Sequence, residues 1–218
     1  LVGSEMCIRD RHSFELNYKK TMGEHTLQSS LFYRKRKDKI ERLRVPYEAG
    51  VTLDSMANVG NDYSLGVELS TQLKVTKWWN LDVNGNIYYY KVMNNINSGG
   101  KKETSTNYDF TVNNLFRLHK NTHIQLDGNF VGPSVTTQGR SDSFWFVNLA
   151  IRQQLFSPHL QSTLSFRDIF NSARYRSDIE TANLQSITRI QPKFPVITLT
   201  ISYTFNDFKR CLLYTSDA

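Results

Sequence analysis

The residues from Phe194 to Phe205, FPVITLTISYTF, constrain the fold more than any other stretch of the chain. Apolar or aromatic side chains occupy alternate positions from Ile197 to Phe205, and the positions between them are small and mostly hydroxylated. This two-residue period over about ten residues predicts a β-strand with one apolar face and one wet face. Such a strand belongs either to a sheet packed on a core in water or to a membrane wall with lipid outside and water within.

The two ends of the chain resemble translated DNA of the transposon-end adapter that is used to prepare sequencing libraries. Residues 1–11, LVGSEMCIRDR, fit the adapter, and residues 210–218, RCLLYTSDA, fit its reverse complement. We therefore expect the native segment to be residues 12–209 and set both ends aside in the fold argument. Cys7 and Cys211 are the only cysteines, and because both lie in these ends the sequence predicts no disulfide.

Basic side chains outnumber acidic ones, which gives a formal net charge of +7 and a pI near 9.4. The adapter-like ends hold equal numbers of both signs, so the excess belongs to the native segment. A high pI often indicates nucleic-acid binding. Asp38 and Glu41 interrupt the main basic run, Arg34 to Arg44, so we expect no nucleic-acid partner. No run of about eighteen apolar residues exists, which excludes a membrane-spanning helix but not a spanning barrel.

Nine segments share the alternation of the terminal strand and predict nine antiparallel strands. In each segment the apolar set contains no charged residue, and the charged side chains all fall in the opposite set. This exclusion is expected of a face turned toward lipid, where a Lys or Arg costs about 2–4 kcal/mol at the bilayer midplane. The expected strands cover residues 14–19, 27–33, 65–74, 81–89, 109–118, 123–130, 145–152, 160–167 and 196–205.

The connections between these segments alternate between short and long along the whole chain. Transmembrane barrels have this pattern, with tight periplasmic turns at one rim and long extracellular loops at the other. No segment has a helical period that would cover the shared apolar face in water. The sequence therefore predicts an all-β, antiparallel, up-and-down transmembrane β-barrel fragment, with about nine strands of a larger barrel. The long connections run from about Lys35 to Asp62 and over residues 93–106, 133–142 and 171–193.

Aromatic residues gather where the two rims of such a barrel are expected. They are Trp78 and Trp79 near one rim, Tyr88 to Tyr90 with Phe144 and Trp145 near the other, and Phe205 at the end of the last strand. Aromatic girdles at both interfaces are typical of outer-membrane barrels. Ordinary enrichment of aromatic residues in strands is the alternative explanation.

From Asn58 onward the sequence resembles the C-terminal part of outer-membrane β-barrel proteins of the TonB-dependent receptor type. The resemblance rests on NDYSLGVELSTQLKVTKWWNL at 61–81, GPSVTTQGRSDSFWFVNLAIRQQL at 132–155, LSFRDIFNSARYRS at 164–177, and the aromatic-terminated strand LTISYTF. It implies a barrel of about twenty-two strands with a plugged lumen. It also implies a place in the cell outer membrane of a Gram-negative bacterium, in contact with lipid and lipopolysaccharide.

The same resemblance implies a function and further partners. Such receptors take up a scarce nutrient or metal chelate, driven by an inner-membrane energy-coupling protein that acts on the plug, and a plug would lie upstream of this segment. The barrel-assembly machinery would recognise the C-terminal strand through Tyr203 and Phe205. The long connections over residues 37–61, 93–106, 133–142 and 171–192 would capture a small ligand that the sequence does not identify. The alternative is a plugless outer-membrane barrel or a soluble β-sandwich with a binding or adhesive role.

The sequence predicts no catalytic, cofactor-binding or metal-binding residue, no cofactor, and no enzymatic activity. His119 and His123 are separated by a turn, so their spacing does not indicate a metal site. No histidine is expected beside Asp168, and the stretch Asp168 to Asn171 is expected to shape the exit from a strand through bonds to its own backbone. The histidines expected near the periplasmic turns are His25, His119, His123 and His159.

The basic run Arg34 to Arg44 is expected on the extracellular side, because counting strand reversals back from Phe205 places its connection there. There it would either bind lipopolysaccharide phosphates through charge-assisted hydrogen bonds or form a solvated charged loop.

Overall fold

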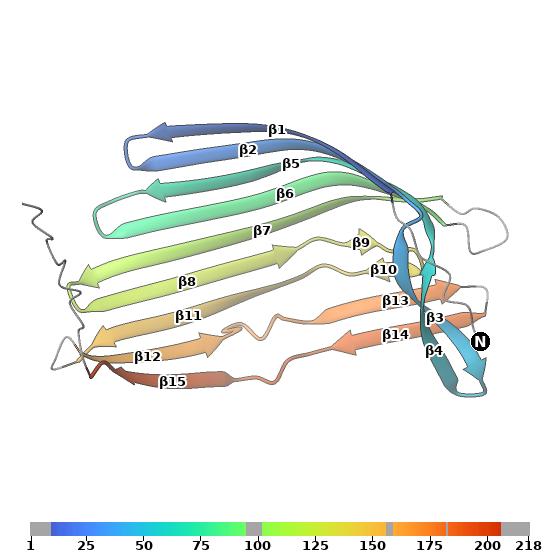
Figure 1. Ribbon diagram of the computed structural model, residues 1–218. Coiled ribbons are helices and arrows are strands. Elements are labelled where there is room, and N and C mark those ends of the chain that lie inside the picture. Colours follow the sequence, from blue (N-terminus) through green and yellow to red (C-terminus); the bar gives the residue numbers. More distant parts are fainter. Residues whose placement is uncertain (1–9, 95–101, 156–158, 182, 206–218) are drawn as a thin grey trace, which may run out of the picture.

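A single curved sheet of nine antiparallel strands makes up the body of the molecule in the computed structural model (Figure 1). The structure describes residues 10–94, 102–155, 159–181 and 183–205, and these form strands but no helix. No helix that would span a membrane is therefore found among them. The nine strands, in sheet order, are β1 (Asp10–Met22), β2 (His25–Lys37), β5 (Gly60–Lys74), β6 (Trp79–Asn94), β7 (Lys102–His119), β8 (Thr122–Val131), β11 (Phe144–Gln154), β12 (Leu160–Arg167) and β15 (Val196–Tyr203).

Each strand overlaps one of the nine segments predicted from the alternation, and most extend beyond it. β6 runs to Asn94 and β7 begins at Lys102, both inside the connection predicted over residues 93–106, whereas β15 ends at Tyr203, before Phe205. Each strand pairs with the next member of the series, in antiparallel register, so the sheet runs up and down without a crossover. The order follows from the short turns, because a connection of a few residues can join only neighbouring antiparallel strands. The predicted all-β, up-and-down fold is therefore confirmed. Cys7 and Cys211 lie outside the described residues.

The apolar side chains of the nine strands share one face of the sheet, which we call the outer face. Leu31 pairs with Val67, and Val67 pairs with Ile87, so apolar rows run across the strands. These side chains are largely bare: Leu16 is 70% exposed and Leu199 is 61% exposed. The buried hydrophobic residues among those described are only Phe32, Leu43, Val59, Tyr90 and Val92. The outer face therefore lacks a protein cover in this structure, as expected of a face turned toward lipid.

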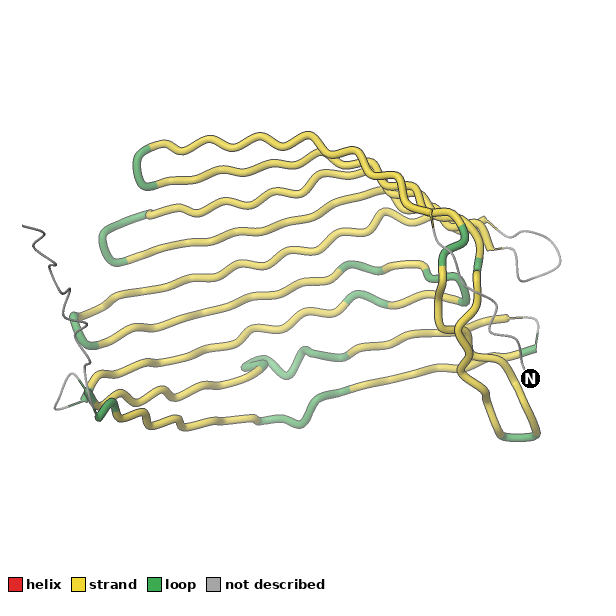
Figure 2. The backbone as a smooth tube through the Cα atoms, viewed as in Figure 1, coloured by secondary structure: helices red, strands yellow, loops and turns green. Residues whose placement is uncertain are grey.

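Short and long connections separate to opposite ends of the sheet (Figure 2). The short turns over residues 23–24, 75–78 and 120–121 lie at the end that we call the turn rim, where β11 also ends and β12 begins. The opposite end, which we call the mouth, carries the long connections. These connections contain two further hairpins and two short strands: β3 (Ile40–Glu48), β4 (Val51–Asn58), β9 (Ser134–Val135), β10 (Gly139–Ser141), β13 (Tyr175–Thr181) and β14 (Leu184–Ile190).

The predicted long polar connection from Lys35 to Asp62 is wrong in its bounds and in its structure. β2 continues to Lys37, β5 begins at Gly60, and the residues between them fold into the β3–β4 hairpin. Each predicted strand ends where the apolar alternation ends. Beyond the lipid the outer face has no need of apolar side chains, so the strands continue without that signal.

The connection predicted over residues 171–193 also contains structure that the sequence did not indicate. Its β13–β14 hairpin joins β10 and β9 in a four-stranded sheet at the mouth, with Gly139 opposite Ile179. Two long connections therefore hold each other in place. Residues 95–101, in the connection predicted over residues 93–106, lie outside the described part of the chain.

The aromatic rim prediction is confirmed at the turn rim and needs correction at the mouth. Trp79 of β6 stacks with Phe116 of β7, and Trp78, in the turn before β6, stacks with Trp79. Near the mouth Trp145 contacts Phe170 on the outer face. Tyr89 is half exposed there as well, but its neighbours Tyr88 and Tyr90 point to the inner face, because successive strand residues face opposite sides. Phe144 likewise lies on the inner side, against Phe146 and Tyr175.

β1 begins at Asp10, inside the segment that the sequence assigns to an adapter. Asp10 and Arg11 pair with Lys37 and Arg36 of β2 through backbone hydrogen bonds. Backbone pairing requires no particular side chain. The assignment of residues 1–11 and 210–218 to adapter DNA therefore stays a prediction.

Candidate functional site at the mouth

The β3–β4 hairpin leaves the wall through a bend at its root. Asp38 has a φ of 50° and Gly60, on the opposite strand, has a φ of 119°. These conformations lie in the left-handed region that ordinary strand residues avoid. Between them Lys39 N donates to Gly60 O at 2.8 Å and Val59 N donates to Lys39 O at 2.7 Å, so the pairing continues through the bend. The hairpin therefore turns sharply away from the wall and runs across the direction of the main strands (Figure 1).

A second set of contacts fastens the hairpin to the connection between β9 and β10. Gln138 Oε1 accepts from Arg44 N at 2.9 Å, and Gln138 Nε2 donates to Arg44 O at 3.0 Å. Thr137 Oγ1 donates to Glu41 Oε2. In the sheet, β5 and β8 are three strands apart, so these bonds join two distant parts of the wall across the mouth. We call the hairpin with this attachment the strap.

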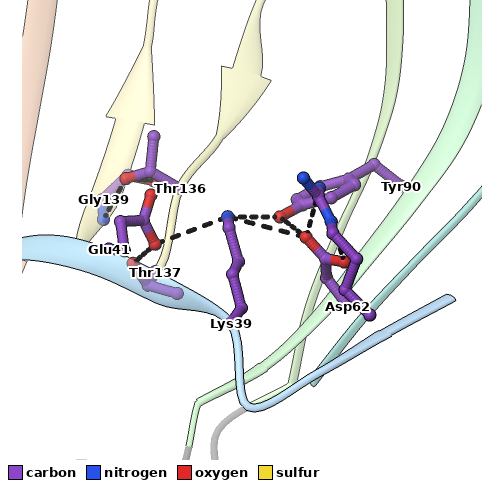
Figure 3. Close-up of polar contacts among 8 residues, drawn as sticks. Lys39, Glu41, Asp62, Tyr90, Thr136, Thr137 and Gly139 are labelled. Carbon is purple, nitrogen blue, oxygen red and sulfur yellow. Dashed lines mark hydrogen bonds and ion pairs between the residues drawn. The ribbon is translucent and has the colours of Figure 1, made fainter. Parts of the chain in front are cut away.

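The root of the strap rests on a buried carboxylate. Asp62 of β5 is 1% exposed and accepts two hydrogen bonds from the Arg36 guanidinium, Nε to Oδ1 at 2.7 Å and Nη2 to Oδ2 at 2.5 Å. Tyr90 Oη donates to the same Oδ2 at 2.9 Å. Lys39 Nζ lies 3.1 Å from Tyr90 Oη, 3.6 Å from Asp62 Oδ2 and 3.5 Å from Glu41 Oε2 (Figure 3). Lys39 thus joins the wall to the strap.

This network balances its charges. Arg36 and Lys39 supply two positive charges, and Asp62 and Glu41 supply two negative ones. A buried carboxylate is tolerated when it is paired and its lone pairs accept hydrogen bonds, and removing one partner would leave an uncompensated buried charge. The strap therefore depends on the wall for its position through Asp62.

Other residues of the basic run also pair with carboxylates of this chain. Arg34 Nη2 lies 3.0 Å from Glu15 Oε1 and 3.4 Å from Glu68 Oε1, on the inner wall. On the strap, Arg44 forms two hydrogen bonds with Asp54, at 2.9 and 3.1 Å, and these lower the pKa of Asp54 below its ordinary value. The expectation of one solvated charged loop is therefore replaced by ion pairs on β2 and on the strap. Binding of lipopolysaccharide phosphates stays a prediction.

Below the mouth, the inner face of β1, β2, β5, β6 and β7 forms an open polar groove of about 570 Å³. Its lining includes the carboxylates of Glu15, Glu68 and Asp109. Asn86 also faces this groove, and its Oδ1 is buried without a hydrogen-bond partner among the described residues. The other end of the same amide, Asn86 Nδ2, donates to Asp109 Oδ1 at 3.4 Å and so links β6 to β7 on the inner wall.

The prediction for Asp168 is confirmed. Its side chain accepts hydrogen bonds from Ser172 N at 2.9 Å, Ser172 Oγ at 3.0 Å and Ala173 N at 2.9 Å, and its backbone has a φ of 51°. Burial opposes ionisation of this carboxyl group, but the three hydrogen bonds outweigh burial and lower the pKa of Asp168 below its ordinary value. Asp168 thus turns the chain out of β12 into the long connection.

His25, His119, His123 and His159 lie at or near the turn rim, as predicted, whereas His12 pairs with Lys35 toward the mouth end of β1. His25 Nδ1 accepts from Lys74 N at 3.3 Å, and His123 lies opposite Arg117 and Arg152. No group of three metal-ligating side chains is found among the described residues. The sequence did not predict the roles of Asp62, Tyr90 and Gln138. Asp62 meets Arg36 through strand pairing across an inserted hairpin and meets Tyr90 on the next strand. Gln138 meets Arg44 across the mouth, so these contacts leave no local signal.

Two solved structures share this architecture at low sequence identity. The ferric yersiniabactin uptake receptor FyuA from Yersinia pestis matches with a TM-score of 0.61 and 19% identity over 88% of this chain and 29% of that chain. The FrpB iron transporter from Neisseria meningitidis matches with a TM-score of 0.59 and 15% identity over 89% of this chain and 31% of that chain. The chain thus spans less than a third of either protein, and the likeness concerns the fold.

The sequence itself places the chain in a family. A search of curated proteins found no match. The sequence model of the outer membrane protein beta-barrel family, in contrast, matches residues 10–203, which include all fifteen strands. The predicted resemblance to outer-membrane receptor barrels and the predicted place in the outer membrane are confirmed by this match together with the two structures. This chain belongs to the outer membrane protein beta-barrel family.

Proposed function

We propose that the chain is part of an outer-membrane receptor that takes up a small solute, a nutrient or a metal chelate, through its barrel. The observation that carries the proposal is the strap, which crosses the mouth above a polar groove on the inner wall. A barrel with a purely structural role does not require a hairpin that bends across its opening. A receptor benefits from such a hairpin, because contacts from several sides of the mouth enclose a solute better than one flat wall.

The groove suits a solute with hydrogen-bonding groups. Glu15, Glu68 and Asp109 supply carboxylate oxygens that accept hydrogen bonds. The names of the two similar structures, a ferric yersiniabactin uptake receptor and an iron transporter, support metal chelates as the first solutes to test. Both names describe transport, which is consistent with the expectation that the chain is not an enzyme.

The partners follow from the same proposal. Residues 12–209 would form the C-terminal part of the barrel, and a plug encoded upstream would connect the barrel to an inner-membrane energy-coupling protein. The outer face would contact lipid and lipopolysaccharide. β15 pairs only with β12 among the described strands, so its other edge is available to the barrel-assembly machinery and then to a closing strand.

The test is to recover the genomic DNA on both sides of the segment and to produce the encoded protein in a bacterium that lacks its own iron-chelate receptors. Uptake of a panel of radiolabelled ferric chelates is then measured with and without the inner-membrane coupling protein. We expect at least one chelate to be taken up only when the receptor and the coupling protein are both present.

Two results would contradict this proposal. If the protein assembles in the outer membrane and solutes pass equally well without the coupling protein, it is a plugless barrel. If the recovered sequence encodes a water-soluble protein, the adhesive alternative replaces transport.

A further inference from the structure

We propose that the inner wall carries a second site, which binds an oxyanion, a carboxylate or a phosphate, near the turn rim. The site consists of Arg117 on β7, His123 on β8 and Arg152 on β11, which we call the basic triad. His123 lies directly opposite Arg117 in one strand pair and directly opposite Arg152 in the other. The three side chains therefore form one row on the inner face of neighbouring strands.

The triad lacks the carboxylates that accompany the arginines near the mouth. No carboxylate of the described residues lies within ion-pair distance of its three side chains, and the hydrogen bond found there joins Arg117 Nη1 to Asn80 Oδ1 at 3.4 Å. Arg34 and Arg36 on the same inner wall are both paired with acidic residues. Arg117 and Arg152 carry like charges on the two strands that flank His123, so they repel each other across it. An anion bound between them would remove this repulsion.

The space beside the triad suits such an anion. A cavity of about 290 Å³ is lined by the triad together with Thr163 and Gln125. Thr163 offers a hydroxyl donor, whereas Gln125 Nε2 already donates to the Asp127 carboxylate at 3.1 and 2.8 Å. Strands lie about 4.8 Å apart, so the Cα atoms of Arg117 and Arg152 are about 10 Å apart and both guanidinium groups can reach one bound group. Guanidinium forks bind carboxylates and phosphates through two parallel hydrogen bonds.

The anion has two conceivable sources with the same chemistry. It is either a free solute that passes the lumen or an acidic side chain of a segment that fills the lumen. The inference does not depend on the proposed uptake function, because the triad lies at the opposite end of the wall from the strap.

The experiment is a calorimetric titration of inorganic phosphate into the 218-residue chain in detergent micelles at low salt, carried out on protein whose β-structure in circular dichroism and cooperative thermal unfolding show that it is folded. We expect saturable binding to one site, weakened about tenfold or more in Arg117→Gln and in Arg152→Gln. Lys74→Gln is the matched control, because Lys74 lies at the same rim and is already paired with Glu24. It should bind phosphate as the unchanged chain does. Thermal unfolding supplies a second readout. Phosphate should raise the Tm of the unchanged chain but not that of a variant carrying both Arg117→Gln and Arg152→Gln.

The same titration on the full-length protein separates the two sources. Phosphate binding to both proteins indicates a free anion, and binding to the 218-residue chain alone indicates that a lumen segment already supplies the carboxylate. Absence of binding to the unchanged chain, or equal binding to the Arg117→Gln and Arg152→Gln variants, would overturn the proposal.

Discussion

In this wall, whether a residue number is odd or even along a strand decides which face of the sheet its side chain occupies. Gly66 lies on the inner face of β5, and a methyl group added to it would overlap Tyr88 Cβ and the Ile87 carbonyl oxygen of the neighbouring strand. Phe32 and Tyr88, which flank it, have ring centroids 6.1 Å apart. The glycine thus allows two inner-wall aromatic rings to meet above it.

We therefore expect Gly66→Ala to destabilise the folded wall by about 1–3 kcal/mol, because the backbone of two strands has to shift. Gly128→Ala is the control, since an added methyl group there would meet only Val112 O at 4.0 Å. Unfolding in urea of detergent-folded protein measures both variants. Equal stability of the two variants would contradict the close approach of β5 and β6.

Asp62 is the residue on which the strap depends. Asp62→Asn removes the charge that Arg36 and Lys39 share, and because Arg36 is partly exposed we expect a loss of about 1–3 kcal/mol rather than the full cost of a buried unpaired charge. Asp54→Asn, which breaks an exposed pair at the outer part of the strap, should leave stability unchanged. Urea unfolding measures the free energy of unfolding of both variants. An equal loss in both would show that the burial of Asp62 does not contribute to stability.

At the scale of elements, the sequence predicted the nine wall strands well and the mouth poorly. Strands in contact with lipid need an apolar residue at every second position, so the alternation identifies strands such as β5 and β15 from the sequence. The strap strand IERLRVPYE alternates only from Leu43 to Tyr47, with Pro46 inside the run, because it lies outside the lipid and is held by Gln138 and Thr137. Those contacts join residues more than ninety positions apart, and no local signal encodes them.

The strap should be separable from the wall. Replacing residues 40–58 by a short Gly-Ser linker keeps Lys39 and Gly60, whose backbone bonds close the root. We expect the shortened protein to assemble in the outer membrane, because strand pairing in the wall does not involve the strap. Chelate uptake should fall, and single-channel conductance should rise, because the mouth is wider. Failure of the shortened protein to assemble would show that the strap is part of the folding unit.

At the scale of the whole molecule, the sheet has two open edges. β1 pairs only with β2, and β15 pairs only with β12, among the described strands. In a membrane, unpaired backbone groups are costly, so spanning sheets close into barrels. We therefore expect additional strands to join these edges, which is consistent with coverage of 29% and 31% of the two similar receptors.

The orientation of the wall predicts which charges it tolerates. Leu69→Arg places a charge on the outer face and should block assembly of the barrel, at a cost of about 2–4 kcal/mol near the midplane. Gln72→Arg places the same charge on the inner face, opposite Asp82, and should be tolerated. Heat-modifiable mobility of membrane fractions in electrophoresis reports assembly. Equal tolerance of both substitutions would overturn the assignment of faces.

The central claim is that one face of this sheet meets lipid and the other meets water. Its most direct test replaces Cys7 and Cys211 by serine, introduces single cysteines along β5 from Leu65 to Leu73, and labels each with a fluorophore in lipid bilayers. Quenching by a lipid-dissolved nitroxide should be strong at the odd positions and weak at the even ones, and a water-soluble quencher should show the opposite pattern. Quenching without this alternation would contradict the account.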